Sequence, residues 1–426
     1  MLSRILKQDY SLSILAITLT IIGIFSIYST GQSIEGERQI IFFIVSLIAY
    51  FLIMTFNYKI YKDKKIQIIL YILIFSLLAL IFILNIRLNN TRRWFVVGKF
   101  DIQPAEFAKI VVILISASFF EIFRKTQNIL YKILLGFVIV FPIFYLIYKQ
   151  PALGNSIIIM IIWLSILFAS FYDHKKFILI ISLFILSTLL IIPFLGINIF
   201  NSNINLIFFQ INISIFLILI LLIYLIYRYA KKTILKPLIL ITLLVGLIFG
   251  FSFKLIVWDH LLKNYQQQRL IGFLNKSSSL NSSINFQTEQ SKIAIGSGGL
   301  WGKGYAQGTQ SRLNFLPEDT TDFIFATLFE EFGFIGALIF FAIYFAFIVR
   351  ILDIMKNTNN RFGILIIVGG LTLLIVQLFI NIGMNMGIMP VTGITLPLVS
   401  YGGSSLLTVF IILGIIQNIY ISQKHQ

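Results

Sequence analysis

The chain contains no cysteine and few charged residues. Among its 426 residues, Asp, Glu, Lys and Arg together make up only 12%. The absence of Cys excludes disulfide bonds and thiolate catalysis. A soluble domain of this size needs far more surface charge, whereas here 58% of the residues are hydrophobic and the mean hydropathy is +0.96. The sequence therefore predicts a protein that crosses a membrane many times.

Long apolar runs dominate the rest of the chain. A run of about 17–25 apolar residues can span a bilayer as an α-helix. We therefore predict an all-α polytopic membrane protein with about twelve transmembrane helices. These lie near residues 11–29, 39–57, 66–86, 104–123, 131–147, 153–171, 176–195, 205–227, 237–257, 322–349, 364–387 and 396–421. The first run lacks a small-residue cleavage site, so we interpret it as a spanning helix rather than a signal peptide.

Acidic residues are scarce relative to basic ones, 16 against 33, which gives a formal charge of +17. This excess would fit a nucleic-acid partner, but most of the basic residues fall in short loops between apolar runs. Because cytoplasmic loops are enriched in Lys and Arg, the distribution predicts cytoplasmic termini and no nucleic-acid partner. The long loop at residues 258–321, between the ninth and tenth predicted helices, is then extracytoplasmic.

A glycine-rich, basic stretch runs from Gln290 to Glu331 and contains Lys292 and Lys303. It does not match a nucleotide-binding P-loop, because Ser297 replaces the first glycine of that motif and Gly304 replaces its Ser or Thr. Asp322 follows at the edge of the next apolar run. We predict a site for an anionic substrate that is held by the membrane. Two further acidic residues of this stretch, Glu318 and Asp319, are candidates for holding a cation.

Some charged residues occupy unexpected places. Arg93 lies in a loop that should be extracytoplasmic, and Arg269 lies in the long loop. Both could contact lipid headgroups or the phosphates of a substrate. Glu106 and Lys109 are three residues apart within a predicted span, so they share one helical face and can form an ion pair. Such a pair is either structural or lines a functional cavity, because ionisable groups inside membranes are rare.

Several blocks of sequence together resemble the SEDS family (shape, elongation, division and sporulation). The blocks are RRW at 92–94, QPAEFAK at 103–109, QPALG at 150–154, YQQQR at 265–269, the glycine-rich run from residue 290, FLPEDTTDFIFA at 315–326 and PVTGITLPLVSYGGSSLL at 390–407. The resemblance extends from about residue 92 to 407 and is greatest to the elongation branch. A family fold would occupy the whole chain, 1–426, as a single integral membrane domain, with an additional helix pair at about 201–255.

The resemblance implies a peptidoglycan glycosyltransferase that polymerises lipid II into glycan strands during cell-wall elongation and cell-shape maintenance. Asp322 matches the proposed catalytic aspartate and would act as the general base. The residues expected to bind substrate are Arg93, Glu106, Lys109, Arg269, Lys292, Lys303, Gln310 and Ser400. The expected partners are lipid II, the lipid-linked nascent glycan, a class B penicillin-binding protein and other elongation-complex proteins. A divalent cation, Mg²⁺ or Mn²⁺, would assist, with no organic cofactor, and the location would be the plasma (inner) membrane.

The chain departs from the family pattern at several positions. Ala105 replaces the usual Ser of the QPSE block, and Ala152 replaces the usual Asp of QPDLGT, which puts a role of that Asp in doubt. Three alternative functions fit the same features. A division-type polymerase or a lipid II flippase would use the same membrane-held anionic substrate, and a non-enzymatic scaffold would recruit the penicillin-binding protein. A transporter should place ionisable groups near the middle of the membrane, whereas here the unusual polar residues gather on the outer side.

Overall fold

The computed structural model describes residues 6–84, 93–97, 100–123, 129–150, 152–171, 266–267, 282–313 and 315–423. Residues 1–170 and 287–426 form one compact unit, and residues 171–286 form a second. The helices predicted near 176–195, 205–227 and 237–257, the additional pair and Arg269 lie outside the described residues. The single-domain organisation stays a prediction.

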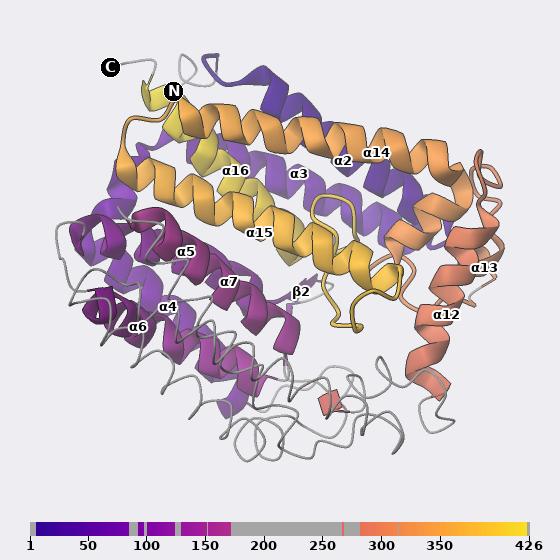
Figure 1. Cartoon of the computed structure of the whole chain (residues 1–426), viewed down its shortest axis with the longest axis horizontal. Helices are drawn as coiled ribbons and strands as arrows, with labels where there is room; N and C mark the ends of the chain where they lie inside the picture. Colours follow the sequence, from indigo (N-terminus) through magenta and orange to yellow (C-terminus); the bar gives the residue numbers. More distant parts are fainter. Residues whose placement is uncertain are drawn as a thin grey trace, which may run out of the picture. The chain divides into compact units, whose positions relative to one another are not determined.

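All the predicted spans that fall on described residues form helices (Figure 1). These helices are α2 (Tyr10–Ser29), α3 (Ser33–Thr55), α4 (Lys64–Ile83), α5 (Pro104–Ile122), α6 (Ile129–Lys149), α7 (Leu153–Ser170), α14 (Ile324–Lys356), α15 (Arg361–Asn385) and α16 (Gly403–Gln423). Within the described part of the chain, eight helices are long and apolar enough to cross a membrane, namely all of these except α5. The chain is therefore a multi-pass membrane protein, although the predicted total of twelve helices stays a prediction.

Shorter elements connect these spans. The 3₁₀ turn η1 (Tyr58–Lys62) precedes α4, and the helices α12 (Ser282–Ser297) and α13 (Thr309–Arg312) lie within the stretch predicted as a long loop. The strands β1 (Phe95–Val97) and β2 (Phe100–Ile102) pair antiparallel, with Phe95 opposite Ile102. The all-α prediction missed this hairpin, because two strands of three residues each are too short to show a periodic pattern.

Helix α16 is the central helix of the larger unit. It packs against α3, α5, α14 and α15, and it is the most buried of the candidate spans in the described residues (Figure 1). At its end, Gln417 accepts a hydrogen bond from the Asp9 backbone N–H (2.9 Å), and Asn418 accepts one from the Tyr58 N–H (3.0 Å). Arg350, near the end of α14, forms an ion pair with Asp9. These contacts gather the ends of α14 and α16, the start of α2 and η1 on one face.

The opposite face is formed by the start of α14, the end of α15 and the start of α16. Helix α16 begins at Gly403, not near residue 396 as predicted. Before it, Leu398 has a φ of 68°, and the Ser400 hydroxyl accepts the Leu396 backbone N–H at 2.7 Å. A side chain that bonds the backbone in this way offers an alternative to the helical hydrogen bonds. Residues 397–402 therefore form an irregular segment on this face, and residues 397–400 of it are buried.

Candidate active site

Asp322 lies two residues before the first residue of α14, on the face away from the chain ends. Its side chain is half-buried. The carboxylate lies beside Gly393, where a methyl group would contact Oδ2 at 3.5 Å. Gly393 has a φ of 70° and belongs to the irregular backbone that connects α15 to α16. The carboxylate predicted to be catalytic is therefore partly open and lies next to a residue without a side chain.

Hydrogen bonds to successive backbone carbonyls hold the segment around Asp322 in place. The Tyr401 N–H donates to the Thr320 carbonyl at 2.9 Å, and the Ser400 hydroxyl donates to the Thr321 carbonyl at 2.6 Å. Ser400 was predicted to bind substrate. In the structure its hydroxyl connects the segment before α16 to the segment before Asp322.

Two asparagines of α15 complete this support. The side-chain amides of Asn381 and Asn385 each donate to the Asp322 carbonyl at 2.9 Å. Asn385 also accepts the Ala326 backbone N–H at 3.1 Å, so it holds both sides of the first turn of α14. Both asparagines are fully buried. A signal for this support is present in the sequence, because the two amides lie four residues apart near the end of a largely apolar helix.

Lys292 adjoins the same support. The neighbouring residue on α12, Ser291, donates its hydroxyl to the Asn385 carbonyl at 2.9 Å. The Lys292 side chain packs against Gly387, where a methyl group would be 2.2 Å from Cε. Helix α12 thus brings Lys292, one of the residues predicted to bind substrate, to the end of α15 that supports Asp322.

Asp319 lies in a buried acidic environment between Asp322 and the start of α3. Its Oδ1 accepts a hydrogen bond from Gln32 at 3.0 Å, while its Oδ2 is buried without a hydrogen-bond partner. Glu35 lies close by and accepts the Thr320 hydroxyl at 2.6 Å. Burial first, and then the charges of Glu35 and Glu318, raise the pKa of the Asp319 carboxyl to about 7.

These acidic residues do not make a metal site by themselves. The Glu318 carboxylate accepts the Thr321 hydroxyl at 2.8 Å. In the described part of the chain, no group of three or more His, Cys, Asp or Glu side chains could hold a metal ion. Among the described residues, the side chains therefore do not fit a cation that is held by protein ligands alone. The divalent cation stays a prediction.

Lys303 and Gln310, both predicted to bind substrate, converge on Glu330. This fully buried carboxylate of α14 accepts the Lys303 ammonium at 2.7 Å and the backbone N–H groups of Thr309 and Gln310 at 2.7 and 3.0 Å. Burying a charge is costly unless it is paired and hydrogen-bonded. Glu330 therefore holds the glycine-rich stretch against α14. Glu330 was not among the predicted site residues, although two adjacent acidic residues, Glu330 and Glu331, in an apolar helix are an unusual signal.

The glycine-rich stretch is joined to a break in α14. Gly333 interrupts the helix with a φ of 65° and a ψ of −164°. The loop replaces the missing helical hydrogen bonds: Lys303 N to Glu330 O at 3.0 Å, Gly304 N to Glu331 O at 3.0 Å, Phe334 N to Gly299 O at 2.9 Å and Ile335 N to Leu300 O at 3.1 Å. Such irregular backbone is tolerated at a membrane only where it is buried in protein or lines a cavity.

The backbone of the glycine-rich stretch lies so close to the backbone of α14 that side chains would not fit between them. A methyl group at Gly302, which has a φ of 79°, would lie 2.0 Å from the Glu331 carbonyl oxygen. A methyl group at Gly333 would lie 2.3 Å from the Gly302 nitrogen. Only glycine combines a positive φ with so small a volume. The loop therefore needs its glycines to pack on α14, which is a different reason from the predicted anion binding.

Three other predicted residues lie near the start of α5. Glu106 and Lys109 form the predicted ion pair at 2.6 Å, with both side chains buried. The Arg93 Nε donates to the Gln150 carbonyl at 3.2 Å, which connects the segment before β1 to the residue after α6. The segment between β2 and α5 is tied to α16, because the Gln103 N–H donates to the Ser404 hydroxyl at 2.9 Å.

The fold and the blocks of sequence around Asp322 define a known class of membrane protein. The family model described as "Cell cycle protein", which covers FtsW, RodA and SpoVE, matches residues 9–201 and 194–425. The chain therefore belongs to the FtsW/RodA/SpoVE family, the SEDS family of the sequence analysis.

Within this family, the similarity favours the elongation branch. Peptidoglycan glycosyltransferase RodA of Treponema pallidum (strain Nichols) is 33% identical over 436 residues, which cover 96% of this chain and 97% of the relative. Peptidoglycan glycosyltransferase MrdB of Escherichia coli (strain K12) is 46% identical over 180 residues, 42% of this chain and 48% of the relative. The predicted family and enzyme class are therefore confirmed.

Solved structures have the same fold. Rod shape determining protein RodA of Thermus thermophilus matches 97% of this chain and 96% of its own length, with a TM-score of 0.60 and 21% identity. A chain from a structure described as the "structural coordination of polymerization and crosslinking by a peptidoglycan synthase complex" matches 98% of this chain and 99% of its own, with a TM-score of 0.69 and 21% identity.

Proposed function

We propose that this peptidoglycan glycosyltransferase polymerises lipid II at the outer face of the plasma (inner) membrane, with Asp322 as the general base. The acceptor lipid II attacks through a sugar hydroxyl, and Asp322 takes the proton of that hydroxyl. The lipid diphosphate leaves from the nascent glycan. A diphosphate is a good leaving group, so it needs neutralisation of charge rather than a general acid.

The observation that carries this proposal is the backbone support of Asp322. A general base has to lie within hydrogen-bond reach of the proton that it removes. The carbonyls of residues 320–322 are held by α15 and by the segment before α16, so the position of the Asp322 carboxyl group is set by several elements at once. Lys292 lies against Gly387 beside this support, and its charge is suited to the diphosphate.

An apolar groove near the site supports a substrate that is held in the membrane. It has a volume of about 210 Å³ and lies between α3, β2, α5 and the start of α16. Phe42, Val45 and Leu407 contribute to its apolar wall, and Asp101 and Ser404 contribute polar groups. The start of α16 follows directly on Ser400 and Tyr401, which hold the backbone before Asp322. A lipid chain in this groove would lie next to the supports of the base.

The biological setting follows from the relatives. Named RodA and MrdB proteins favour a role in cell-wall elongation and cell shape over a division role like that of FtsW. A solved complex that couples polymerisation to crosslinking has a chain of this fold. We therefore propose a class B penicillin-binding protein as the partner that supplies crosslinking, together with other elongation-complex proteins. The termini would be cytoplasmic, because the basic residues of η1 and of the start of α4 lie on the face where α2 starts and α16 ends.

The test uses purified full-length protein with its penicillin-binding partner and lipid II. We expect Asp322→Asn to lower glycan polymerisation about 100-fold or more, the usual contribution of a general base, while it leaves folding and partner binding intact. Glu318→Gln is the matched control, because Glu318 is an exposed carboxylate four residues away. The product is measured as glycan length on a gel.

Near-normal glycan from Asp322→Asn would contradict the general-base role and would favour a scaffold. A flippase would be favoured if the native protein made no polymer but moved lipid II across vesicle membranes. Asp322→Asn would then lose this translocation while it still bound the partner.

A further inference from the structure

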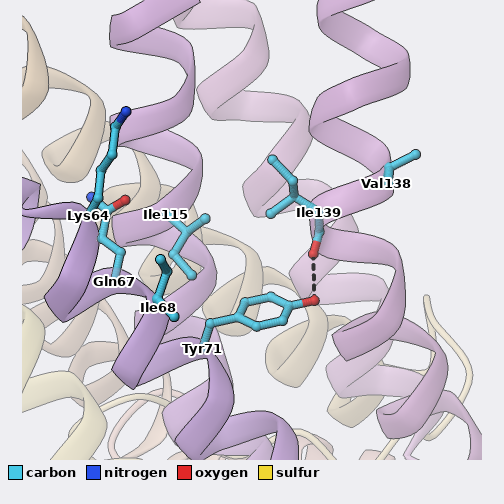
Figure 2. Close-up of a pocket in the computed structure, with 7 residues that line it drawn as sticks. All are labelled: Lys64, Gln67, Ile68, Tyr71, Ile115, Val138 and Ile139. Carbon is cyan, nitrogen blue, oxygen red and sulfur yellow. Dashed lines mark hydrogen bonds between the residues drawn. The ribbon is translucent and has the colours of Figure 1, made fainter.

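A second groove lies between α4, α5 and α6, and Lys64 at the start of α4 is one of its lining residues. It has a volume of about 470 Å³ and is lined by Lys64, Gln67, Ile68, Tyr71, Ile115, Val138 and Ile139 (Figure 2). Its walls are apolar except at one end. This groove is separate from the proposed substrate groove, which is formed by α3, β2, α5 and α16.

A hydrogen bond between two helices closes the deep end of this groove. The Tyr71 hydroxyl of α4 donates to the Ile139 carbonyl of α6 at 3.0 Å (Figure 2). This bond lies close to Pro142, which lacks the N–H that would bond to the Val138 carbonyl in a regular helix. Ile68 and Val138 remain 58% and 63% exposed, so the groove opens sideways toward lipid.

The shallow end of the groove is cationic. Lys64 is exposed, and in Figure 2 its ammonium group points away from Tyr71, beyond the apolar residues. In the described part of the chain, Lys64 takes part in no ion pair, whereas Lys62 is paired with Glu121 at 2.9 Å. Gln67 donates its amide to the Tyr61 carbonyl at 2.8 Å, which holds η1 against the start of α4. Lys64 therefore supplies the positive charge at the mouth.

The length of the groove fits within one leaflet of a bilayer. Seven residues of helix separate Lys64 from Tyr71, which is a rise of about 10 Å, and half of a bilayer core is about 15 Å. The mouth lies on the face where α2 starts and α16 ends, because Asn418 of α16 accepts the N–H of Tyr58 in η1 at 3.0 Å. Basic groups between helices at this kind of surface attract anionic headgroups.

We propose that this groove binds one acyl chain of an anionic phospholipid, with the phosphate of its headgroup on Lys64. The lipid occupies the leaflet on the side where α2 starts and α16 ends, and it is distinct from the lipid-linked substrate. Lys64 selects the charge of the headgroup, and the apolar walls of the groove hold the chain.

The test is native mass spectrometry of the full-length protein in detergent, titrated with dioleoyl phosphatidylglycerol or dioleoyl phosphatidylcholine. We expect the native protein to prefer phosphatidylglycerol about fivefold, which corresponds to about 1 kcal/mol for one basic residue near the surface. Lys64→Gln should remove this preference. Lys65→Gln is the matched control, because Lys65 is the next residue and is exposed but does not line the groove.

A second pair of variants tests the groove itself. Ile115→Trp should fill the groove and weaken the binding of both lipids, and Val138→Trp does so from the exposed rim, where the fold tolerates it. Equal losses in Lys64→Gln and Lys65→Gln would overturn the proposal in favour of a diffuse surface charge. Equal affinity for the two lipids in the native protein, or full phosphatidylglycerol binding by Val138→Trp, would also overturn it.

Discussion

Asp319 shows how a single carboxyl group near the site can respond to pH. It is 2% exposed, has the acidic neighbours Glu35 and Glu318, and its pKa is raised to about 7. The folded protein therefore binds this proton more tightly than the unfolded chain, whose Asp has a pKa of about 3.9. Stability should decrease as the pH rises from about 4 to about 7 and should then level off.

Asp319→Asn should remove this part of the pH dependence. We expect the variant to gain stability over the native protein at pH 8 and to gain much less at pH 5, because the native side chain is then largely protonated. Thermal unfolding in detergent across this range measures the difference. Parallel curves for the two proteins would show that Asp319 does not titrate in this window.

The Glu106–Lys109 pair allows a second test at the scale of residues. Removing one partner of a buried pair leaves an unpaired charge and costs about 3–5 kcal/mol. We therefore expect Glu106→Gln and Lys109→Met each to be less stable than the double variant. A double-mutant cycle on unfolding stability gives the coupling energy directly, and additive losses would mean that the two side chains do not interact.

Some residue contacts could be predicted from the sequence and others could not. The Glu106–Lys109 pair follows from helical spacing, because both partners lie on one helix. The contacts of Asp322 with Asn381 and Asn385 join residues about 60 positions apart, at separations of 59 and 63. No local pattern encodes such a separation. The same holds for Lys303, whose partner Glu330 follows it by 27 residues.

At the scale of elements, the junction between the glycine-rich stretch and α14 makes a sharp prediction. Gly302→Ala would force a methyl group against the Glu331 carbonyl and require a left-handed backbone. Overpacking typically costs about 1–3 kcal/mol and the left-handed conformation about 1–2 kcal/mol. We expect a clear decrease of the thermal midpoint together with lost polymerisation.

Gly296→Ala is the control for this prediction. Gly296 lies within α12, where no atom lies within 4 Å of the added methyl group. Alanine is favoured over glycine in a helix by about 0.5–1 kcal/mol, so this variant should be slightly more stable. If both substitutions lowered the midpoint equally, the close approach at residue 302 would not explain the glycine.

Helices were easier to predict than the segments between them. Length and hydropathy are sufficient to locate a span, because lipid requires every backbone group to be satisfied within the helix. Hydropathy does not distinguish buried irregular backbone from helix. Residues 396–399 are apolar, so hydropathy predicts them as part of the last helix. In the structure this segment is not helical. Its conformation depends on tertiary contacts, because Ser400 donates to the Thr321 carbonyl and accepts a hydrogen bond from Gln39.

For the whole molecule, the arrangement of α14, α15 and α16 predicts which loops share a membrane face. These three spans follow one another in the chain, and the end of α16 contacts η1. The glycine-rich stretch before α14 must then lie on the face opposite to η1. The natural absence of Cys makes the test clean.

A single cysteine at the exposed Gln307 should react with a membrane-impermeant thiol reagent in intact cells. One at the exposed Lys59 in η1 should react only after the membrane is opened. Labelling at 59 in intact cells, with protection at 307, would reverse the proposed orientation.

The anchoring of Asp322 through its backbone has a practical consequence. Since the backbone carbonyls of residues 320–322 accept hydrogen bonds from α15 and from the segment before α16, these contacts stay available when the reactive carboxylate is exchanged for an amide. An Asp322→Asn protein would then act as a substrate trap, in which donor and acceptor accumulate without being consumed. Such a stalled complex would reveal which cations surround the diphosphate.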